Sequence, residues 1–252
     1  MESAPLPLIR STLLSQFPYV RLAQSTMQGE SPDTPYSFNL GYNLGDDDSR
    51  VTSNIARFAN AVDLEPEDLA FMNQVHGETI REISEPGAYD DTDAIITTQP
   101  GVGLTVRTAD CVPIMLYAPG ANVIAAVHAG WRGTAEHITR KTAERLFSNH
   151  GAEASSTYAY IGACAGVCCY EVGDEVAALF PERWTQRAEG KSTRLDLPGI
   201  NLQQLLDLGI PAGNIEVCGL CSIHEQHLLH SFRRDGAKSG RMLTTIVLRE
   251  EV

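Results

Sequence analysis

Long apolar runs are missing from this sequence, and its hydrophobic residues, 43% of the chain, are spread over many short segments. No segment approaches the roughly 20 consecutive apolar residues that a membrane-spanning helix requires. The first 19 residues also lack the basic start, continuous apolar centre and small-residue cleavage site of a secretory signal. We therefore expect a cytoplasmic protein without a membrane partner.

Positive charge is scarce as well. The chain carries 19 lysine and arginine residues against 32 aspartate and glutamate residues, which gives a formal net charge of -13 at pH 7. Nucleic acids are bound by basic surfaces, so this balance argues against a nucleic-acid partner. An anionic substrate would have to meet a local cluster of arginines.

Repeats, low-complexity tracts and linkers rich in proline, glycine and serine are absent. We interpret the chain as one domain over residues 1–252, in which 1–36 is the least regular segment. A chain of 252 residues is long enough to bury a full core without a metal or disulfide to support it.

Helical and strand-like patterns are mixed along the chain. Apolar spacing and end signals, with Asn201 as one N-cap, predict helices over 50–62, 135–147 and 201–208. Short β-rich runs predict strands over 94–98, 102–106, 112–117, 123–127, 158–161, 215–218 and 242–248. The turn at 118–122 predicts a hairpin, so we expect an α/β fold: a single compact domain with mixed β-sheets and flanking helices.

Three loop segments place a nitrogen or sulfur metal ligand beside an apolar run. They contain His76 in NQVHG, Cys111 in TADC and His128 in VHAGWRG. Two imidazoles and one thiolate match the donors that zinc prefers, and three protein ligands leave a fourth position for water or substrate, as in catalytic sites. The spacings of 35 and 17 residues fit no zinc-finger motif. From spacing alone, a packed or solvated role stays open for each residue.

Arg132 lies four residues after His128 and just before a helix that we expect to begin near Thr134. A guanidinium beside free backbone N–H groups is suited to hold a phosphate, and a surface ion pair is the alternative. Further arginines that add positive charge or serve the structure are Arg107, Arg233, Arg234 and Arg241.

Longer strings around these residues extend over most of the chain: SFNLG (37–41), LGDD (44–47), NQVHG (73–77), TADCVPI (108–114), AAVHAGWRGT (125–134), CCYEVGDEV (168–176) and SFRRDGAKSGRM (231–242). In these strings and in their order, the chain resembles the widespread bacterial family named after YfiH. Its members carry laccase-domain or multicopper polyphenol oxidase designations, and the family is related to a zinc-binding purine nucleoside phosphorylase.

The resemblance implies a compact α/β fold and places the family's metal ligands on His76, Cys111 and His128. It implies that phosphate attacks the anomeric carbon of adenosine or inosine and releases base and ribose 1-phosphate, with adenosine deamination as a side activity. Zinc is the implied cofactor, and a purine nucleoside and phosphate are the implied partners. Asp110 is then a candidate acid/base, a partner of the metal ligands or a structural residue. Contacts to substrate or phosphate are expected from Arg132, Arg233, Arg234 and Asn39.

Several positions depart from the family pattern. Met27 and Ile55 stand where the family has arginines, Ala163 and Val167 replace prolines, and Phe232 replaces a tyrosine. These departures concern substrate contacts and leave the metal ligands intact.

Three other functions compete with phosphorolysis. Two histidines and a cysteine are also the ligands of a blue-copper centre, which makes a copper polyphenol oxidase the runner-up. Only five of the 7 histidines remain beyond the two ligands, however, too few and too scattered for an oxygen-reducing copper cluster. A zinc amidase acting on a peptidoglycan precursor stays open because an open zinc site also hydrolyses amides. A non-catalytic zinc-binding module would need a fourth protein ligand, and no motif offers one.

The six cysteines are expected to be reduced in a cytosolic protein of this size. Cys218 and Cys221 form a C-x-x-C, which is typical of half a zinc site or of a redox pair, but no partner pair is evident. We interpret both as packed thiols. The resemblance places Cys164, Cys168 and Cys169 near the pocket, and inert buried thiols are the alternative.

Three histidines near the C-terminus, His224, His227 and His230, follow one another at a spacing of three residues. A metal cluster and a solvated helix or loop fit that spacing equally well. We favour solvated side chains because the surrounding stretch is polar.

Overall fold

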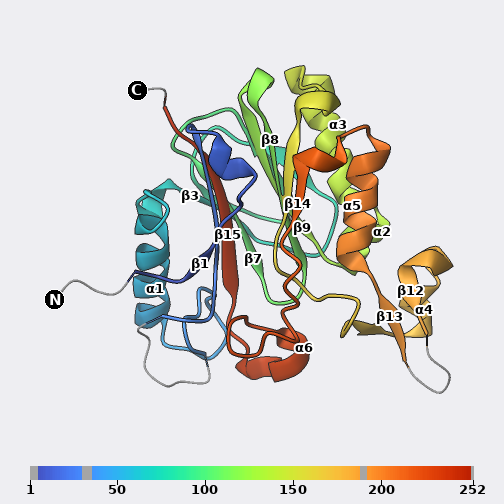
Figure 1. The fold of residues 1–252 in the computed structure, drawn as a ribbon. Coiled ribbons are helices and arrows are strands. Elements are labelled where there is room, and N and C mark those ends of the chain that lie inside the picture. Colours follow the sequence, from blue (N-terminus) through green and yellow to red (C-terminus); the bar gives the residue numbers. More distant parts are fainter. Residues whose placement is uncertain (1–4, 30–35, 188–191, 251–252) are drawn as a thin grey trace.

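Two mixed β-sheets packed face to face form the centre of the computed structural model, which describes residues 5–29, 36–187 and 192–250 (Figure 1). The first sheet has the spatial order β1 (Leu8–Ile9), β2 (Val20–Ser25), β15 (Met242–Leu248), β7 (Gly103–Thr108), β3 (Leu69–Met72) and β5 (Gly87–Tyr89). The second has the order β14 (Ile215–Val217), β10 (Tyr158–Ile161), β8 (Val112–Ala118), β9 (Val123–Ala129), β6 (Ala94–Thr97) and β4 (Ile80–Glu82). A third, small sheet has the order β11 (Glu171–Val172), β13 (Thr193–Leu195) and β12 (Thr185–Gln186).

Both large sheets contain parallel and antiparallel neighbours. In the first sheet β3 runs parallel to β7, whereas β15 runs antiparallel to β7 and β2. In the second, β10 runs parallel to β14 and antiparallel to β8. The predicted mixed α/β fold is therefore confirmed. None of the helices in the described ranges has the length and apolar character to cross a membrane.

Strands β8 and β9 form the hairpin that the turn at 118–122 predicted. They pair antiparallel from Val112 opposite Ala129 to Ala118 opposite Val123, and Asn122 closes the turn in the left-handed region at φ 45°. Every residue of both strands is buried because each strand has apolar material on both faces. A continuous apolar run is the sequence pattern of such a strand.

Helices cover the outer faces of the two sheets, so the fold has four layers. They are α1 (Asp48–Asn60) on the first sheet and α2 (Trp131–Ala135), α3 (Ile138–His150) and α5 (Leu197–Asp207) on the second. Two short helices lie elsewhere: α4 (Asp174–Ala177) beside the third sheet and α6 (Phe232–Asp235) below the two large sheets in Figure 1. Separate apolar cores lie between the sheets and beneath each helical layer. The layers hold the strand ends in fixed positions, and the candidate site is built on those ends.

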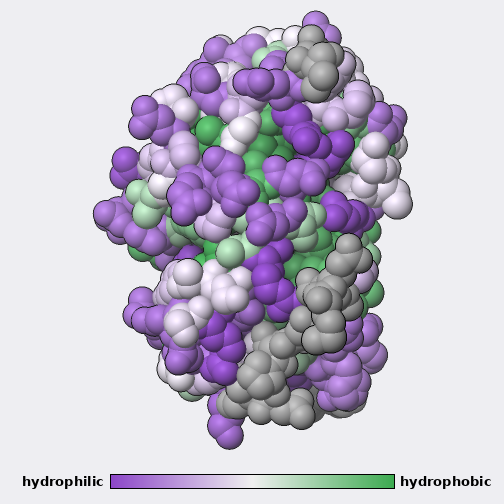
Figure 2. All heavy atoms as spheres, turned by 90° about the vertical axis from the view of Figure 1, so that its left-hand side faces the viewer, coloured by the Kyte–Doolittle hydropathy of each residue, from purple (hydrophilic) through white to green (hydrophobic). Residues whose placement is uncertain are grey.

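Helix α1 confirms the amphipathic helix expected over 50–62. The Asp47 side chain accepts hydrogen bonds from the backbone N–H groups of Ser49 and Arg50, which caps the first turn. Its apolar face, which includes Val51 and Phe58, packs on the first sheet. Figure 2 views the molecule from the side on which α1 lies in Figure 1, and hydrophilic residues cover much of that face.

Two helix predictions need correction. The helix expected over 135–147 is broken, because His137 adopts a left-handed conformation with φ 59° between α2 and α3. Helix α2 begins at Trp131 instead of near Thr134, so Arg132 lies inside its first turn. Asn201 is not an N-cap.

Helix α5 begins earlier than its predicted start at Asn201. Asp196 caps it by accepting a hydrogen bond from the backbone N–H of Gly199. The fully buried amide of Asn201 lies inside the helix, where it donates to Thr134 and accepts from Thr139. The polar residue that looked like a helix start therefore ties α5 to α2 and α3 through a buried hydrogen-bond network.

Candidate metal centre and its pocket

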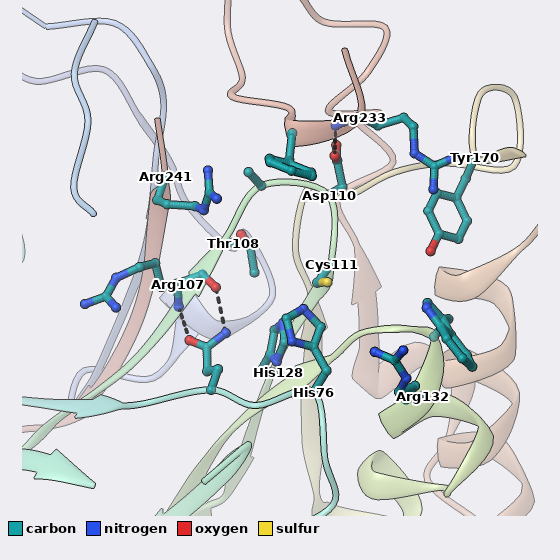
Figure 3. Close-up of a pocket in the computed structure, with 14 residues that line it drawn as sticks. His76, Arg107, Thr108, Asp110, Cys111, His128, Arg132, Tyr170, Arg233 and Arg241 are labelled. Carbon is teal, nitrogen blue, oxygen red and sulfur yellow. Dashed lines mark hydrogen bonds between the residues drawn. The ribbon is translucent and has the colours of Figure 1, made fainter. Parts of the chain in front are cut away.

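His76, Cys111 and His128 come together at one end of the two sheets (Figure 3). One ligand atom from each lies within 4.8 Å of those of the other two. The two imidazole rings meet edge to face, with their centroids 4.9 Å apart. Nitrogen and sulfur donors at this spacing form a group that could hold a metal ion.

Two tight backbone conformations position the trio. His76, in the loop after β3, has φ 61°, and Asp110, at the corner between β7 and β8, has φ 99°. Gln74 anchors the first loop, because its amide exchanges two 2.8 Å hydrogen bonds with the backbone of Arg107 in β7. Left-handed φ values at residues other than glycine carry strain and collect at functional sites.

A carboxylate that the sequence did not single out, Asp93, holds two of the three ligands. It is fully buried just before β6, and its Oδ1 lies 2.8 Å from His128 Nδ1. The same carboxylate accepts hydrogen bonds from the backbone N–H groups of Val75, His76 and Gly77, at 3.3, 3.0 and 2.7 Å. With Nδ1 donating to Asp93, the Nε2 atom of His128 is left as the ligand.

The charges of the trio are coupled. Burial alone would raise the pKa of the Cys111 thiol, but the charge and hydrogen bonds of His128 and His76 outweigh burial and lower it to about 6. Burial alone would lower the pKa of His128, but the Cys111 thiolate and Asp93 outweigh it and raise that pKa to about 9. Near neutral pH the metal-free site therefore contains a thiolate beside an imidazolium. A metal that binds here must displace the imidazolium proton.

Asp93 itself stays ionised. Burial raises its pKa, but the hydrogen bonds from His128 and from the backbone of Gly77 and Val75 outweigh burial and hold it below its ordinary value. An ionised carboxylate behind a ligating imidazole fixes the ring orientation and raises the basicity of the ligand.

Gly130 is packed against two of the three ligands. A Cβ atom at this position would lie 3.1 Å from His76 Cδ2 and 3.2 Å from Cys111 Sγ. The backbone of Gly130, with φ -74°, is accessible to any residue, so only the ligands resist a side chain here.

We expect Gly130→Ala to lower metal affinity by roughly tenfold, since groups that support metal ligands contribute about that much or more. Gly120→Ala is the matched control, because a Cβ there meets nothing within 4 Å. Metal competition with a chelator measures both variants. Equal affinities for the two would show that the trio has room to relax.

A pocket of about 490 Å³ opens over the trio. Its walls combine arginines with aromatic rings, and among the described residues Asp110 supplies their one carboxylate. The lining residues besides the trio are Gln74, Arg107, Thr108, Ala109, Asp110, Trp131, Arg132, Tyr170, Phe232, Arg233 and Arg241. Four arginines in the wall make this a locally positive site in an acidic protein.

The four arginines differ in how freely they face the pocket. In the described residues, no protein oxygen accepts a hydrogen bond from the Arg132 guanidinium, which stacks on Trp131 at 4.5 Å. The Arg233 guanidinium stacks on Tyr170 at 5.0 Å and donates to a backbone carbonyl. Figure 3 shows Arg241 directed toward the centre and the Arg107 side chain directed away from the metal ligands. Burial lowers the pKa of Arg107, and the charge of Arg241 lowers it further.

Two of the expected substrate contacts lie outside the pocket. The Arg234 guanidinium donates to the carbonyls of Ser222 and Leu229, at 2.8 and 2.9 Å, and to Asp235. Asn39 is fully buried, and its Oδ1 accepts from the backbone N–H of Arg241 at 2.9 Å. Arg234 therefore organises its own loop, whereas Asn39 positions an arginine that does reach the pocket.

Asp110 lines the pocket with a carboxylate whose two oxygens are occupied. Oδ1 accepts from the Ser222 hydroxyl at 2.7 Å, and Oδ2 accepts from the backbone N–H of Arg233 at 2.6 Å. Asp110 thus ties the loop of Cys111 to the two segments that bring Ser222 and Arg233 to the pocket.

The departures from the family pattern fall mostly outside the pocket. Ile55 is buried in the core beneath α1, and Met27 donates its backbone N–H to the carbonyl of Leu228; neither lines the pocket. Phe232 does line it and is half exposed. The replacement of the family's tyrosine by Phe232 therefore removes a hydroxyl group from the pocket wall.

The remaining cysteines and histidines differ partly from expectation. All six cysteines are free. Cys221 does not pair with Cys218 but meets Cys168 and Cys169, whose sulfur atoms lie within 4.8 Å of one another and of its own. His230 is 1% exposed, so the prediction that it is solvated is wrong, whereas His224 and His227 are exposed, as predicted.

Comparison with known proteins identifies the family. A family model described as "Multi-copper polyphenol oxidoreductase laccase" matches residues 21–249. A Deinococcus radiodurans protein named purine nucleoside phosphorylase is 39% identical over 98% of this chain and 95% of its own length. The chain belongs to this family. Its relative YlmD of Geobacillus stearothermophilus, also named a purine nucleoside phosphorylase, is 36% identical over 88% of both chains.

Solved structures of relatives have the same fold. The crystal structure of Geobacillus stearothermophilus YlmD matches with a TM-score of 0.90 and 31% identity over 99% of this chain and 98% of that one. Bacillus licheniformis YfiH matches with a TM-score of 0.90 and 30% identity, over 98% and 97% of the two chains. The family resemblance seen in the sequence strings is thereby confirmed.

Proposed function

We propose that this chain is a zinc-dependent purine nucleoside phosphorylase, which uses inorganic phosphate to release the base from adenosine or inosine, with adenosine deamination as a side activity. The observation that carries the proposal is the pocket over His76, Cys111 and His128, whose wall contains four arginines and one carboxylate. The names of the relatives point to the same reaction. Cytoplasmic location remains our expectation.

The ligand set fits zinc. Two imidazole nitrogens and one thiolate are borderline donors, and three protein ligands leave one position of a tetrahedron open. Asp93 fixes His128 in the tautomer that a metal ligand requires, and the lowered pKa of Cys111 keeps that sulfur as a thiolate. Zinc held by these residues would supply a Lewis acid at the floor of the pocket.

The arginines are suited to bind phosphate. The Arg132 guanidinium has no hydrogen-bond acceptor among the described residues, so its donors are available to an anion. Arg241 points into the pocket, and burial lowers its pKa despite the nearby charges of Asp110 and Cys111, which raise it. Guanidinium groups in a partly desolvated wall bind phosphate through paired, charge-assisted hydrogen bonds and stabilise charge that develops during transfer.

The aromatic side chains provide a surface for the purine. Trp131, Tyr170 and Phe232 line the wall beside the arginines. Flat aromatic rings bind a base through stacking and apolar contact, which orients the nucleoside without consuming the polar groups. Each of the three rings carries an arginine, with Arg132 over Trp131, Arg233 over Tyr170 and Arg241 over Phe232, so the base and the phosphate would bind to adjoining parts of the same wall.

We assign Asp110 a positioning role in this reaction. Both of its oxygens already accept hydrogen bonds, from Ser222 and from the backbone of Arg233. Those bonds hold the arginine loop against the loop that carries Cys111.

The inventory of ligands does not favour a copper polyphenol oxidase. In the described part of the chain, the two groups of neighbouring metal-binding side chains include only two histidines, His76 and His128. An oxygen-reducing copper cluster requires many further imidazoles near the first centre. The other histidines of the described ranges lie outside both groups.

Base release from adenosine or inosine should require phosphate and should yield ribose 1-phosphate instead of free ribose. Arg132→Ala should lower phosphate use about tenfold or more while zinc content is retained, since it removes a charge-assisted contact but no metal ligand. Arg183→Ala is the matched control, because Arg183 also stacks on the tryptophan that neighbours it, at 5.4 Å, but lies outside the pocket. The rate of phosphate-dependent nucleoside cleavage, followed by product chromatography, is measured for the unmodified protein and for both variants.

Base release that is equal without phosphate would indicate a hydrolase. Absence of turnover with every purine nucleoside would overturn the phosphorylase proposal and leave the amidase as the candidate to assay. An equal loss of activity in Arg132→Ala and Arg183→Ala would remove Arg132 from the phosphate site.

A further inference from the structure

A second group of metal-binding side chains lies behind the pocket, and the proposed reaction makes no use of it. The sulfur atoms of Cys168, Cys169 and Cys221 all lie within 4.8 Å of one another. They come from two separate segments, which pair through a bridge between Cys164 and Cys221. Three sulfurs bound to one ion at about 2.3 Å are about 4 Å apart, so this spacing is close to that of a trigonal thiolate site.

The backbone holds Cys221 in place and reaches its sulfur at one point. The N–H of Gly166 donates to Cys221 Sγ at 3.3 Å. The N–H groups of His224 and Glu225 donate to the Cys221 carbonyl, at 3.1 and 2.9 Å, which closes the turn that carries this sulfur. A backbone N–H that donates to sulfur favours the thiolate, which is the form that binds a metal.

Gly166 lies in contact with two of the sulfurs. A Cβ atom on Gly166 would lie 3.4 Å from Cys168 Sγ and 3.6 Å from Cys221 Sγ, so the backbone of Gly166 closes one side of the group. The adjacent turn, in which Cys169 and Tyr170 both donate to the Gly166 carbonyl, brings Cys168 and Cys169 over Cys221. Cys168 is exposed to solvent, which gives an ion an entry path.

We propose that Cys168, Cys169 and Cys221 form a second metal site, which binds one soft, thiophilic d¹⁰ ion in trigonal coordination, with Cu(I) as the fitting ion. An all-sulfur donor set selects soft ions. Zinc with three protein ligands keeps a fourth position for water, as in the pocket trio, whereas three thiolates complete the coordination of a trigonal Cu(I) ion, and in the described residues the group contains three sulfurs and no histidine or carboxylate. The site is distinct from the pocket trio, which contains two imidazoles.

The two sites are neighbours without sharing a ligand. Ser222, which follows Cys221, donates its hydroxyl to Asp110, and Asp110 precedes Cys111. Tyr170, which follows Cys169, lines the pocket. Binding studies must therefore separate the two sites, and removal of Cys111 does so.

The test is a Cu(I) titration of the full-length, reduced Cys111→Ser protein under anaerobic conditions, in competition with a chromogenic Cu(I) chelator. We expect about one Cu(I) per chain, with ultraviolet thiolate-to-copper absorption, because three thiolates remain together. Adding Cys168→Ser should abolish this binding, whereas adding Cys218→Ser should leave it unchanged. Cys218 is the matched control, since it is the C-x-x-C neighbour of Cys221 but lies outside the group.

Melting temperatures show whether each variant is folded, and the exposed position of Cys168 makes its substitution the decisive one. Loss of Cu(I) in the Cys218→Ser protein with retention in the Cys168→Ser protein would overturn the proposal in favour of the C-x-x-C pair. Stoichiometric zinc binding without Cu(I) binding would overturn the trigonal assignment. These readouts do not depend on nucleoside turnover, so failure of the proposed function leaves them intact.

Discussion

Cys111→Ser should reduce the zinc content of the purified protein from about one zinc per chain to a trace, because the thiolate is the one anionic ligand of the trio. Nucleoside phosphorolysis should fall by about a hundredfold or more, since a Lewis acid contributes several kcal/mol to such reactions. Elemental analysis after dialysis against zinc, together with the phosphorolysis assay, measures both effects.

Cys164→Ser is a suitable control for the loss of a thiol, because Cys164 is a buried cysteine outside both metal-binding groups. The fold should survive removal of the metal, since the apolar cores between and outside the sheets do not involve the trio. Full metal content in Cys111→Ser would exclude this cysteine as a ligand. Stoichiometric copper in the unmodified protein, purified without added copper, that is lost in Cys111→Ser but retained in Cys168→Ser would overturn the zinc assignment.

The strands that the sequence predicted are those with an unambiguous pattern. Runs such as 112–117 and 123–127 are apolar on both faces, and the structure places them at the centre of the second sheet. Strand β2 was missed, although it is nearly completely buried, because VRLAQS contains polar residues whose partners are distant. The Gln24 side chain, for example, exchanges hydrogen bonds with the backbone of Ala163, a contact that the local sequence does not predict.

The candidate site was predicted where chemistry is carried by residue type and was missed where it is carried by tertiary contact. His76, Cys111 and His128 have distinctive side chains, and the structure brings them together. Asp93 is one of 32 acidic residues, and its only local signal is its position directly before a buried strand. Cys218 and Cys221 were interpreted as packed thiols because no partner pair was evident nearby in the sequence, whereas the sulfur neighbours of Cys221 in space, Cys168 and Cys169, are about 50 residues away.

Asp93→Asn should weaken metal binding by 10- to 100-fold, the range typical of groups that orient metal ligands. Both carboxylate oxygens of Asp93 accept hydrogen bonds from backbone N–H groups of the His76 loop. The amide of asparagine keeps one acceptor oxygen, and its NH₂ group would face N–H donors in place of the other. His128 also loses the carboxylate that accepts its Nδ1–H, so the ring is no longer held in one orientation. The pKa of His128 falls as well, because Asp93 is one of the groups that raise it. Chelator competition measures the affinity, and thermal unfolding of the metal-free protein measures stability separately.

Glu216→Gln is the matched control for this last substitution. Glu216 accepts hydrogen bonds from the backbone N–H groups of Thr12 and Leu13 and from the Ser11 hydroxyl, so it also holds a loop through a carboxylate, but it lies outside the pocket. Asp93→Asn should lower stability by about 1 to 3 kcal/mol because it leaves donors to a fully buried group without an acceptor. Glu216→Gln should lower stability less, since its donors are partly or fully exposed to water. Only Asp93→Asn should lower metal affinity. If the two variants bind metal equally well, the carboxylate of Asp93 serves the fold alone, and the orientation of His128 must be set by the backbone of β9.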